Sequence, residues 1–139
     1  VVNVVLNQKY QSALERNITM LLSVNDLSGL TMREEDLVTL LVNLLDNAVE
    51  ACEKLEENRV IRFKMVLEEG ELILSVRNPV AVPVIIDGRR IVTTKKDGGG
   101  NHGIGLLNVN GVIERSGGTS ALRCEDGWFC FSAMIPAAE

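Results

Sequence analysis

The stretch of sequence that decides the fold is LVTLLVNLLDNAVEACEKL, residues 37–55. At about 100° per residue its leucines and other apolar residues cover one wide arc, as expected of a helix that packs on a core. Its polar side chains fall together in an arc of roughly 100° on the opposite side: Asn43, Asp46, Asn47 and Glu50. A solvated face explains most such stripes, but it usually carries Lys, Arg and Glu, whereas Asn and Asp disfavour helix.

Asn43 and Asn47 are the residues in this stripe that indicate chemistry. They lie one turn apart, about 6 Å along the helix axis, so their carboxamide oxygens can face one point in space. Such oxygens suit a hard cation like Mg²⁺, which takes few protein ligands and completes its shell with water and phosphate oxygens. The stripe therefore predicts a magnesium–phosphate site, with a solvated helix face as the alternative.

On the N-terminal side of this helix, the pattern predicts a short helix within residues 1–17 and a strand at 18–24. Thr31 and Glu34 have the spacing of a capping box, which should start the central helix. We expect that helix to run to about Glu57.

On the C-terminal side, two segments of alternating hydrophobicity, 60–67 and 71–78, predict a hairpin. Residues 79–105 hold two of the prolines and many of the glycines, and predict a long irregular segment. A helix from about residue 106 to 115 and a last hairpin, 119–124 with 128–135, should follow. This order predicts a two-layer α/β sandwich with helices on one face of the sheet.

The segment TTKKDGGGNHGIGLLN, residues 93–108, places lysines and glycines directly before a predicted helix. Free backbone N–H groups and the positive end of the helix dipole make such a junction an anion site. The cations Arg89, Arg90, Lys95 and Lys96 add a local basic patch. A surface loop with a glycine-based helix entry is the alternative. The segment matches neither the dinucleotide-binding fingerprint nor a Walker P-loop, because it lacks the third glycine and a G-K-[ST] triplet.

Composition bounds the function classes. A chain of 139 residues is one domain, and its net charge of −5 argues against non-specific nucleic-acid binding. Three cysteines without a C-x-x-C indicate neither a disulfide framework nor a zinc site, and favour a reduced compartment. No apolar stretch approaches the roughly 18 residues of a membrane span. Because the chain opens at Val1 rather than at a methionine, we expect it to be a piece of a longer protein.

Three motifs occur together: NLLDNAVEA (43–51), Asn78 at the end of a predicted strand, and NHGIGL (101–106). In this order they resemble the N-box, first glycine box and second glycine box of the GHKL ATPases, which include gyrase, histidine kinases and mismatch-repair ATPases. The resemblance covers residues 18–136 and is greatest to sensor histidine kinases of the peptide quorum-sensing type. It implies the GHKL fold, with a mixed, mostly antiparallel sheet.

The resemblance implies roles for individual residues. Asn43 and Asn47 would be catalytic and would bind the nucleotide, with Asn47 as the Mg²⁺ ligand. Asn78 stands where most of the superfamily has the Asp that receives the adenine amino group, and Asn78-Pro79-Val80 replaces the usual first glycine box, as in the quorum-sensing subgroup. The remaining nucleotide contacts would come from the second glycine box and the loop before it: Lys95, His102, Gly103, Ile104, Gly105 and Leu106.

The implied function is that of an ATP-binding catalytic domain, residues 18–139, of a protein-histidine kinase, with residues 1–17 as the end of the dimerisation region. His102 is the only histidine, so the phosphoacceptor would lie outside this chain, which should be inactive alone. The implied cofactors are ATP and Mg²⁺. The implied partners are the histidine-bearing dimerisation domain of a homodimeric parent receptor and a response regulator, in the cytoplasm. The alternatives are a nucleotide-binding regulatory module without phosphotransfer and a stand-alone serine kinase of the anti-sigma-factor type.

Overall fold

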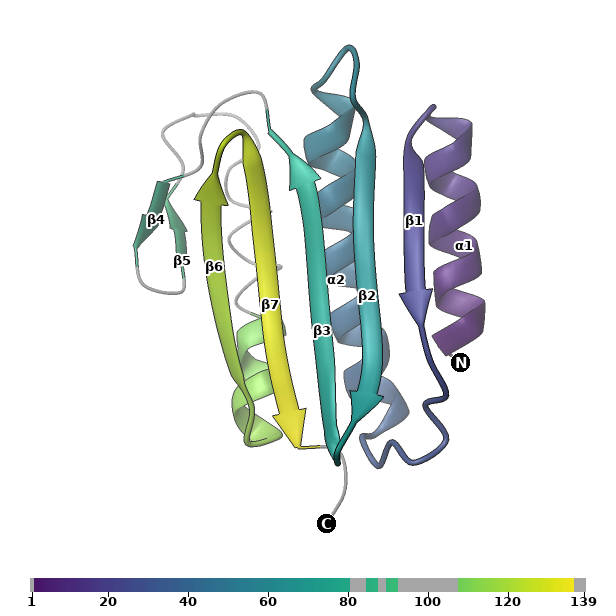
Figure 1. The fold of residues 1–139 in the computed structure, drawn as a ribbon, viewed down its shortest axis with the longest axis vertical. Coiled ribbons are helices and arrows are strands. Elements are labelled where there is room, and N and C mark those ends of the chain that lie inside the picture. The colour runs from purple at the N-terminus through teal and green to yellow at the C-terminus, as the bar shows by residue number, and fades with distance from the viewer. Residues whose placement is uncertain (1, 81–84, 88–89, 93–107, 137–139) are drawn as a thin grey trace.

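A five-stranded mixed sheet forms one layer of the computed structural model, which describes residues 2–80, 85–87, 90–92 and 108–136 (Figure 1). The strand order is β1-β2-β3-β7-β6. β1 pairs with β2 in parallel, and the other pairs are antiparallel. The strands are β1 (Thr19–Val24), β2 (Val60–Glu68), β3 (Glu71–Pro79), β6 (Thr119–Glu125) and β7 (Trp128–Pro136).

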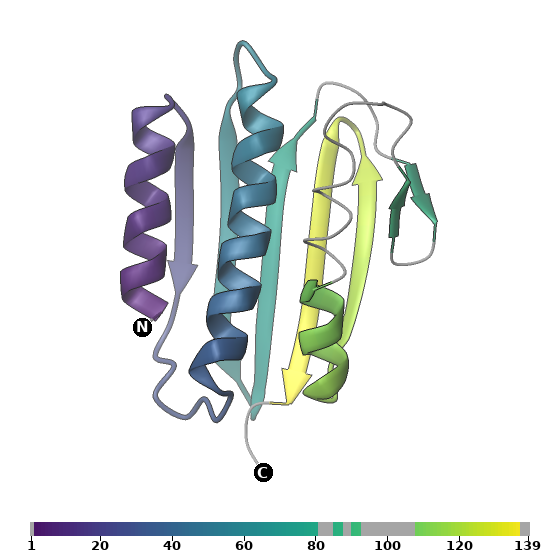
Figure 2. The same cartoon turned by 180° about the vertical axis from the view of Figure 1, so that it is seen from behind.

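The helices form the second layer. α1 (Val2–Glu15), α2 (Glu34–Glu53) and the helix over residues 108–115 all lie on one face of the sheet, as seen from behind in Figure 2. No described helix lies on the opposite face, which is turned to the viewer in Figure 1. The predicted two-layer α/β sandwich, with a mostly antiparallel sheet and helices on one face, is therefore confirmed.

The core lies between the two layers, and the alternation along the strands builds it. In β3, Leu72, Leu74 and Val76 point towards the helices and are buried. β2 and β7 contribute the same alternation, and α2 adds its apolar arc. The residues of α2 that are buried are Leu37, Leu40, Leu41, Leu44, Leu45, Ala48, Val49 and Cys52. The predicted apolar arc of this helix is thus the face that packs on the sheet.

The ends of α2 differ from the prediction. Its N-cap is Arg33, which has an extended backbone and makes no side-chain cap bond, so the predicted capping box at Thr31 is wrong. Three carboxylates in the first turn, Glu34 to Asp36, stabilise this end through the helix dipole instead. The helix ends at Glu53, four residues before the predicted end.

Arg59 explains the early end of α2. Its guanidinium donates to the carbonyl oxygen of Leu55 at 2.6 Å and to that of Glu53 at 3.2 Å, just past and at the end of the helix. A third bond, 2.8 Å long, reaches the carbonyl oxygen of Arg16 after α1. The last carbonyl groups of a helix lack hydrogen-bond partners within the helix. The Arg59 side chain supplies such partners here, so the helix can end at Glu53.

The predicted helix at residues 1–17 is confirmed as α1, which runs parallel to α2 (Figure 2). Val5, Leu6 and Ala13 bury its inner side in the same core as the sheet. Two ion pairs, seven residues apart along each segment, join α1 and the residue directly after it to α2. They are Lys9–Asp46 at 2.6 Å and Arg16–Glu53 at 2.9 Å. The assignment of this segment to the end of a dimerisation region stays a prediction.

The segment at 79–105 was predicted to be irregular throughout, and this is wrong for part of it. β4 (Ile85–Asp87) and β5 (Arg90–Val92) pair antiparallel as a separate two-stranded sheet. The sequence carries a signal for this hairpin. Asp87 pairs with Arg90, so Gly88 and Arg89 are the two residues between the strands, and a glycine first in a two-residue loop is typical of a hairpin.

The predicted C-terminal hairpin is confirmed as β6 and β7. The predicted helix before it is confirmed over residues 108–115 and ends, as expected, at a glycine pair. Gly117 has a φ of +76°, in the left-handed region that glycine adopts freely. A Cβ at Gly118 would lie 2.6 Å from the carbonyl oxygen of Met134, so the close approach of this turn to β7 requires glycine.

Candidate functional site

Asn78 breaks the apolar pattern of β3. It follows Leu72, Leu74 and Val76 on the helix-facing side of the strand, where the alternation calls for another apolar residue. Its exposed fraction is 1%, and among the described residues it is the one buried polar side chain. A buried amide without partners is costly, so its hydrogen bonds identify what this position is built for.

The carboxamide of Asn78 is satisfied on one side only. Its Nδ2 donates to the carbonyl oxygen of Pro79 at 3.1 Å. Its Oδ1 is buried and has no hydrogen-bond partner among the described residues. An unsatisfied buried acceptor costs about 1–3 kcal/mol. The side chain therefore presents a lone acceptor on the core side of the sheet, ready for an N–H donor.

Asn78 stands at the position where the resemblance to the superfamily leads us to expect an aspartate. An asparagine has a donor that a carboxylate lacks, and that donor needs its own partner. The Pro79 carbonyl accepts from one of the two N–H groups of this amide, and the buried Oδ1 is the atom that has no partner among the described residues. Its neighbour in register on β7 is Phe129, which is also buried, so the acceptor lies beside an apolar surface that suits a planar base.

Asn43 and Asn47 lie on α2, the helix that packs against β3, and both are half-buried. The Nδ2 of Asn43 donates to the carbonyl oxygen of Thr39 at 2.7 Å. This bond ties the amide nitrogen to the preceding turn of its own helix. The structure thus places the three predicted asparagines on the same side of the sheet, in two adjacent elements.

The polar stripe of α2 does not act as one unit. Asp46 turns towards α1, where Lys9 binds it at 2.6 Å. Its role is therefore to join the two helices, which the sequence did not indicate because Lys9 is far away in the chain. The carboxamide oxygens of Asn43 and Asn47 stay the predicted ligands of a cation. The described residues contain no group of three His, Cys, Asp or Glu that could hold a metal ion.

Carboxamide oxygens are hard ligands, so Asn43 and Asn47 fit Mg²⁺ that takes its other ligands from phosphate and water. The orphaned oxygen of Asn78 fits the amino group of a base. The predicted residues of the second glycine box and its loop lie outside the described residues: Lys95, His102, Gly103, Ile104, Gly105 and Leu106. Sequence reasoning missed the bond to Thr39, and no residue type signals it, because the acceptor is a backbone carbonyl that every residue carries.

The sequence matches the GHKL domain family over residues 32–136, which is most of the chain. The chain belongs to the GHKL family. This GHKL domain has no match among curated proteins. The more specific resemblance to the quorum-sensing type stays a prediction.

Solved structures similar to this GHKL domain include histidine kinases. The nucleotide-free catalytic domain of the histidine kinase ThkA has a TM-score of 0.73 and 21% identity, over 98% of this chain and 92% of that one. The histidine kinase AdeS of Acinetobacter baumannii has a TM-score of 0.68 and 16% identity, over 99% of this chain and 65% of that one. Full-length ShkA in complex with AMPPNP has a TM-score of 0.68 and 22% identity, over 99% of this chain and 30% of that one.

These likenesses establish a shared fold. The GHKL domain corresponds to nearly all of the ThkA domain and to less than a third of full-length ShkA. Within the described residues, no helix combines the length and the apolar character that crossing a bilayer requires.

Proposed function

We propose that this GHKL domain is the ATP-binding catalytic domain of a sensor histidine kinase, which positions Mg²⁺–ATP for phosphoryl transfer to a histidine outside this chain. The observation that carries the proposal is the buried, orphaned oxygen of Asn78. Supporting it, the similar structures are histidine kinases, and one of them holds the ATP analogue AMPPNP.

The chain's own residues divide the work as follows. Asn78 accepts a hydrogen bond from the adenine amino group, which fixes the base. Asn47 would hold Mg²⁺, with Asn43 beside it, and bound Mg²⁺ would neutralise the phosphate charge. Lys95 and His102 to Leu106 are proposed to contact the triphosphate, as the family motif implies.

The two asparagines of α2 also limit the chemistry. A carboxamide cannot take a proton from water, so neither Asn43 nor Asn47 serves as a general base for hydrolysis. An imidazole acceptor needs no such base because its lone pair is already nucleophilic, so positioning and charge neutralisation suffice. The acceptor is proposed to lie on the dimerisation domain of a homodimeric, membrane-bound parent receptor, which passes the phosphoryl group to a response regulator in the cytoplasm.

A first experiment tests metal-dependent binding by calorimetric titration of ATP in Mg²⁺ and in chelator. We expect binding in Mg²⁺ and at least tenfold weaker binding in chelator. Asn47→Ala should remove this difference. Asp46→Asn is the matched control, because Asp46 binds Lys9 of α1, and it should keep the difference. Equal affinity in both buffers for the wild type would contradict the role of Asn47.

A second experiment separates the proposal from its rival, a nucleotide-binding regulatory module without phosphotransfer. The altered first glycine box, Asn78-Pro79-Val80, is the observation that favours the rival. With labelled ATP, the chain alone should acquire no acid-labile phosphate. Adding a histidine-bearing dimerisation domain of a related kinase in trans should give label on that domain. Nucleotide binding without any transfer to such domains would support the rival.

A further inference from the structure

The sheet face without a described helix carries a row of arginines. Arg62 of β2 is opposite Arg77 of β3 in the register. Arg77 is opposite Cys130 of β7, which in turn is opposite Arg123 of β6. Residues in register share a face of the sheet, so the three guanidinium groups extend across four neighbouring strands. All three arginines are exposed.

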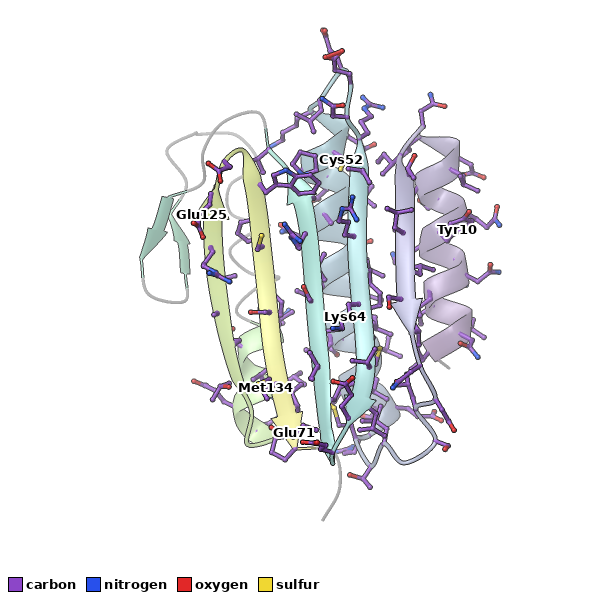
Figure 3. All side chains as sticks on the ribbon, in the orientation of Figure 1. Tyr10, Cys52, Lys64, Glu71, Glu125 and Met134 are labelled. Atoms are coloured by element: carbon purple, nitrogen blue, oxygen red, sulfur yellow. The ribbon has the colours of Figure 1, made fainter. Side chains whose placement is uncertain are left out.

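Lys64 widens this row into a patch that we call the basic face: Arg62, Lys64, Arg77 and Arg123. Lys64 lies two residues after Arg62 and therefore points to the same side, where Figure 3 shows it on β2. Among the described residues, the carboxylate that pairs with this face is Glu125, 3.7 Å from Arg123 in a mostly exposed pair. Such a pair is weak.

Two arrangements show that the basic face is not neutralised from within. Arg62 and Arg77 stand directly opposite each other, and like charges in that position destabilise a sheet. The Arg77 guanidinium lies over the ring of Trp128, 5.6 Å from its centroid, which orients the cation without cancelling its charge. The chain as a whole has an excess of carboxylates, yet none of the described ones pairs with Arg62, Lys64 or Arg77.

The spacing of the row indicates the shape of a partner. Neighbouring strands are about 4.8 Å apart, so Arg62, Arg77 and Arg123 lie at roughly 0, 5 and 14 Å along the row. Residues i, i+3 and i+10 of a helix lie at about 0, 4.5 and 15 Å along its axis and within one face. Glutamates at these positions would each meet a guanidinium.

We propose that the basic face binds an acidic amphipathic helix of another protein, laid across the strands. Two exposed apolar side chains on the same face, Leu21 beside Arg62 and Met134 further along β7, would add apolar contact. Met134 is seen on this face in Figure 3. The net charge of −5 repels extended polyanions such as DNA or an anionic bilayer, which favours a short acidic helix whose charge is confined to one side.

The test uses the 139-residue chain and a fluorescent alanine-rich helical peptide with glutamates at positions 4, 7, 11 and 14, measured by anisotropy at low salt. Arg62→Gln with Arg123→Gln should weaken binding at least tenfold. Arg62→Lys with Arg123→Lys keeps the positive charges and should bind the peptide within threefold of the wild-type affinity. The matched control, Arg33→Gln with Arg115→Gln, removes two arginines that pair with Glu35 and Asp36 away from this face, and should stay within twofold of wild type.

A peptide isomer with the same glutamates spread around the helix should bind at least tenfold more weakly. Equal binding of the two peptides, or an equal loss in the control variant, would overturn the proposal. Two further results would overturn it. One is that the chain binds phosphatidylglycerol vesicles or duplex DNA more tightly than the peptide, and that Arg62→Gln with Arg123→Gln abolishes this binding. The other is that the chain self-associates in ultracentrifugation and that the same double variant does not. Thermal melting followed by circular dichroism should show that all three double variants remain folded.

Discussion

Polar groups meet the core in two regions of this molecule, and the two regions treat them differently. Where α1 and the residue after it lie beside α2, the charged side chains at the border of the core form ion pairs. These pairs are Lys9 with Asp46 and Arg16 with Glu53. At the end of β3, the buried Asn78 keeps an acceptor without a partner among the described residues. A satisfied polar group explains how elements are joined, whereas an unsatisfied one indicates a ligand. The comparison separates residues that hold the fold together from residues that we propose to bind a ligand.

The largest expected effect is at the unsatisfied position. Asn78→Leu should weaken ATP binding at least 100-fold, about 2.7 kcal/mol, since it removes the acceptor for the base. The same change should raise the free energy of unfolding by about 1 kcal/mol, because an unsatisfied buried acceptor disappears. Nucleotide titration and urea unfolding measure the two effects.

The control for this variant is Leu72→Val, on the same strand face but at the other end of β3. It should cost about 1 kcal/mol of stability and leave ATP affinity within twofold. If Asn78→Leu lowers stability and leaves nucleotide affinity unchanged, the comparison breaks, because Asn78 would then be a structural residue.

A smaller effect is expected at Cys52, a residue of the apolar core whose thiol contacts a backbone carbonyl. Its thiol lies on α2, 3.8 Å from the carbonyl oxygen of Val60, and burial raises its pKa from 9.0 to about 11. The unfolded chain therefore loses the thiol proton before the folded chain does. As pH rises from 9 to 11, the stability that the neutral thiol contributes should be lost, roughly 2 kcal/mol in all.

Urea unfolding between pH 8 and 11, for the wild type and Cys52→Ala, measures this contribution. The wild type should lose about 2 kcal/mol more than the variant across that range, because other titrating groups are common to both. Parallel stability curves for the two proteins would show that the Cys52 pKa is not raised in the fold.

The smallest effect is expected at the α1–α2 interface. The Asp46 side chain is 51% exposed, and half-exposed ion pairs contribute at most about 1 kcal/mol. A double-mutant cycle with Lys9→Gln and Asp46→Asn should give a coupling energy below that value and leave ATP affinity within twofold. A coupling above about 2 kcal/mol, or a loss of nucleotide affinity, would place Asp46 in the site after all.

Hydrophobic periodicity predicted most of the fold because the forces behind it are local. The alternation of Leu72, Leu74 and Val76 predicted which face of β3 is buried. The leucines of α2 predicted which side of the helix packs on the sheet. The exact helix ends were not predictable in this way. Thr31 had the spacing of a capping box, but Arg33 is the N-cap. The C-terminal end depends on Arg59, which also binds the carbonyl of Arg16, more than forty residues earlier in the chain.

The sequence pattern proposed which residues make up the candidate site. It did not predict the hydrogen bonds and ion pairs that these residues and their neighbours form. Asn78 was singled out by its place at the end of a strand, yet nothing in the pattern predicted that its Nδ2 donates to the Pro79 carbonyl. Asp46 shares the polar arc with Asn43 and Asn47, and the sequence did not assign it a role. Its true partner, Lys9, comes from packing of two helices, which no pattern within α2 reports.

The central claim is that the orphaned oxygen of Asn78 accepts a hydrogen bond from the amino group of adenine. Inosine triphosphate tests it directly, since its base carries an oxygen where adenine carries the amino group. Displacement of a fluorescent nucleotide should show the wild type and Asn78→Asp binding ATP at least tenfold more tightly than inosine triphosphate, about 1.4 kcal/mol. In Asn78→Leu the two nucleotides should bind within twofold of each other. The same preference for ATP in Asn78→Leu as in the wild type would contradict the claim.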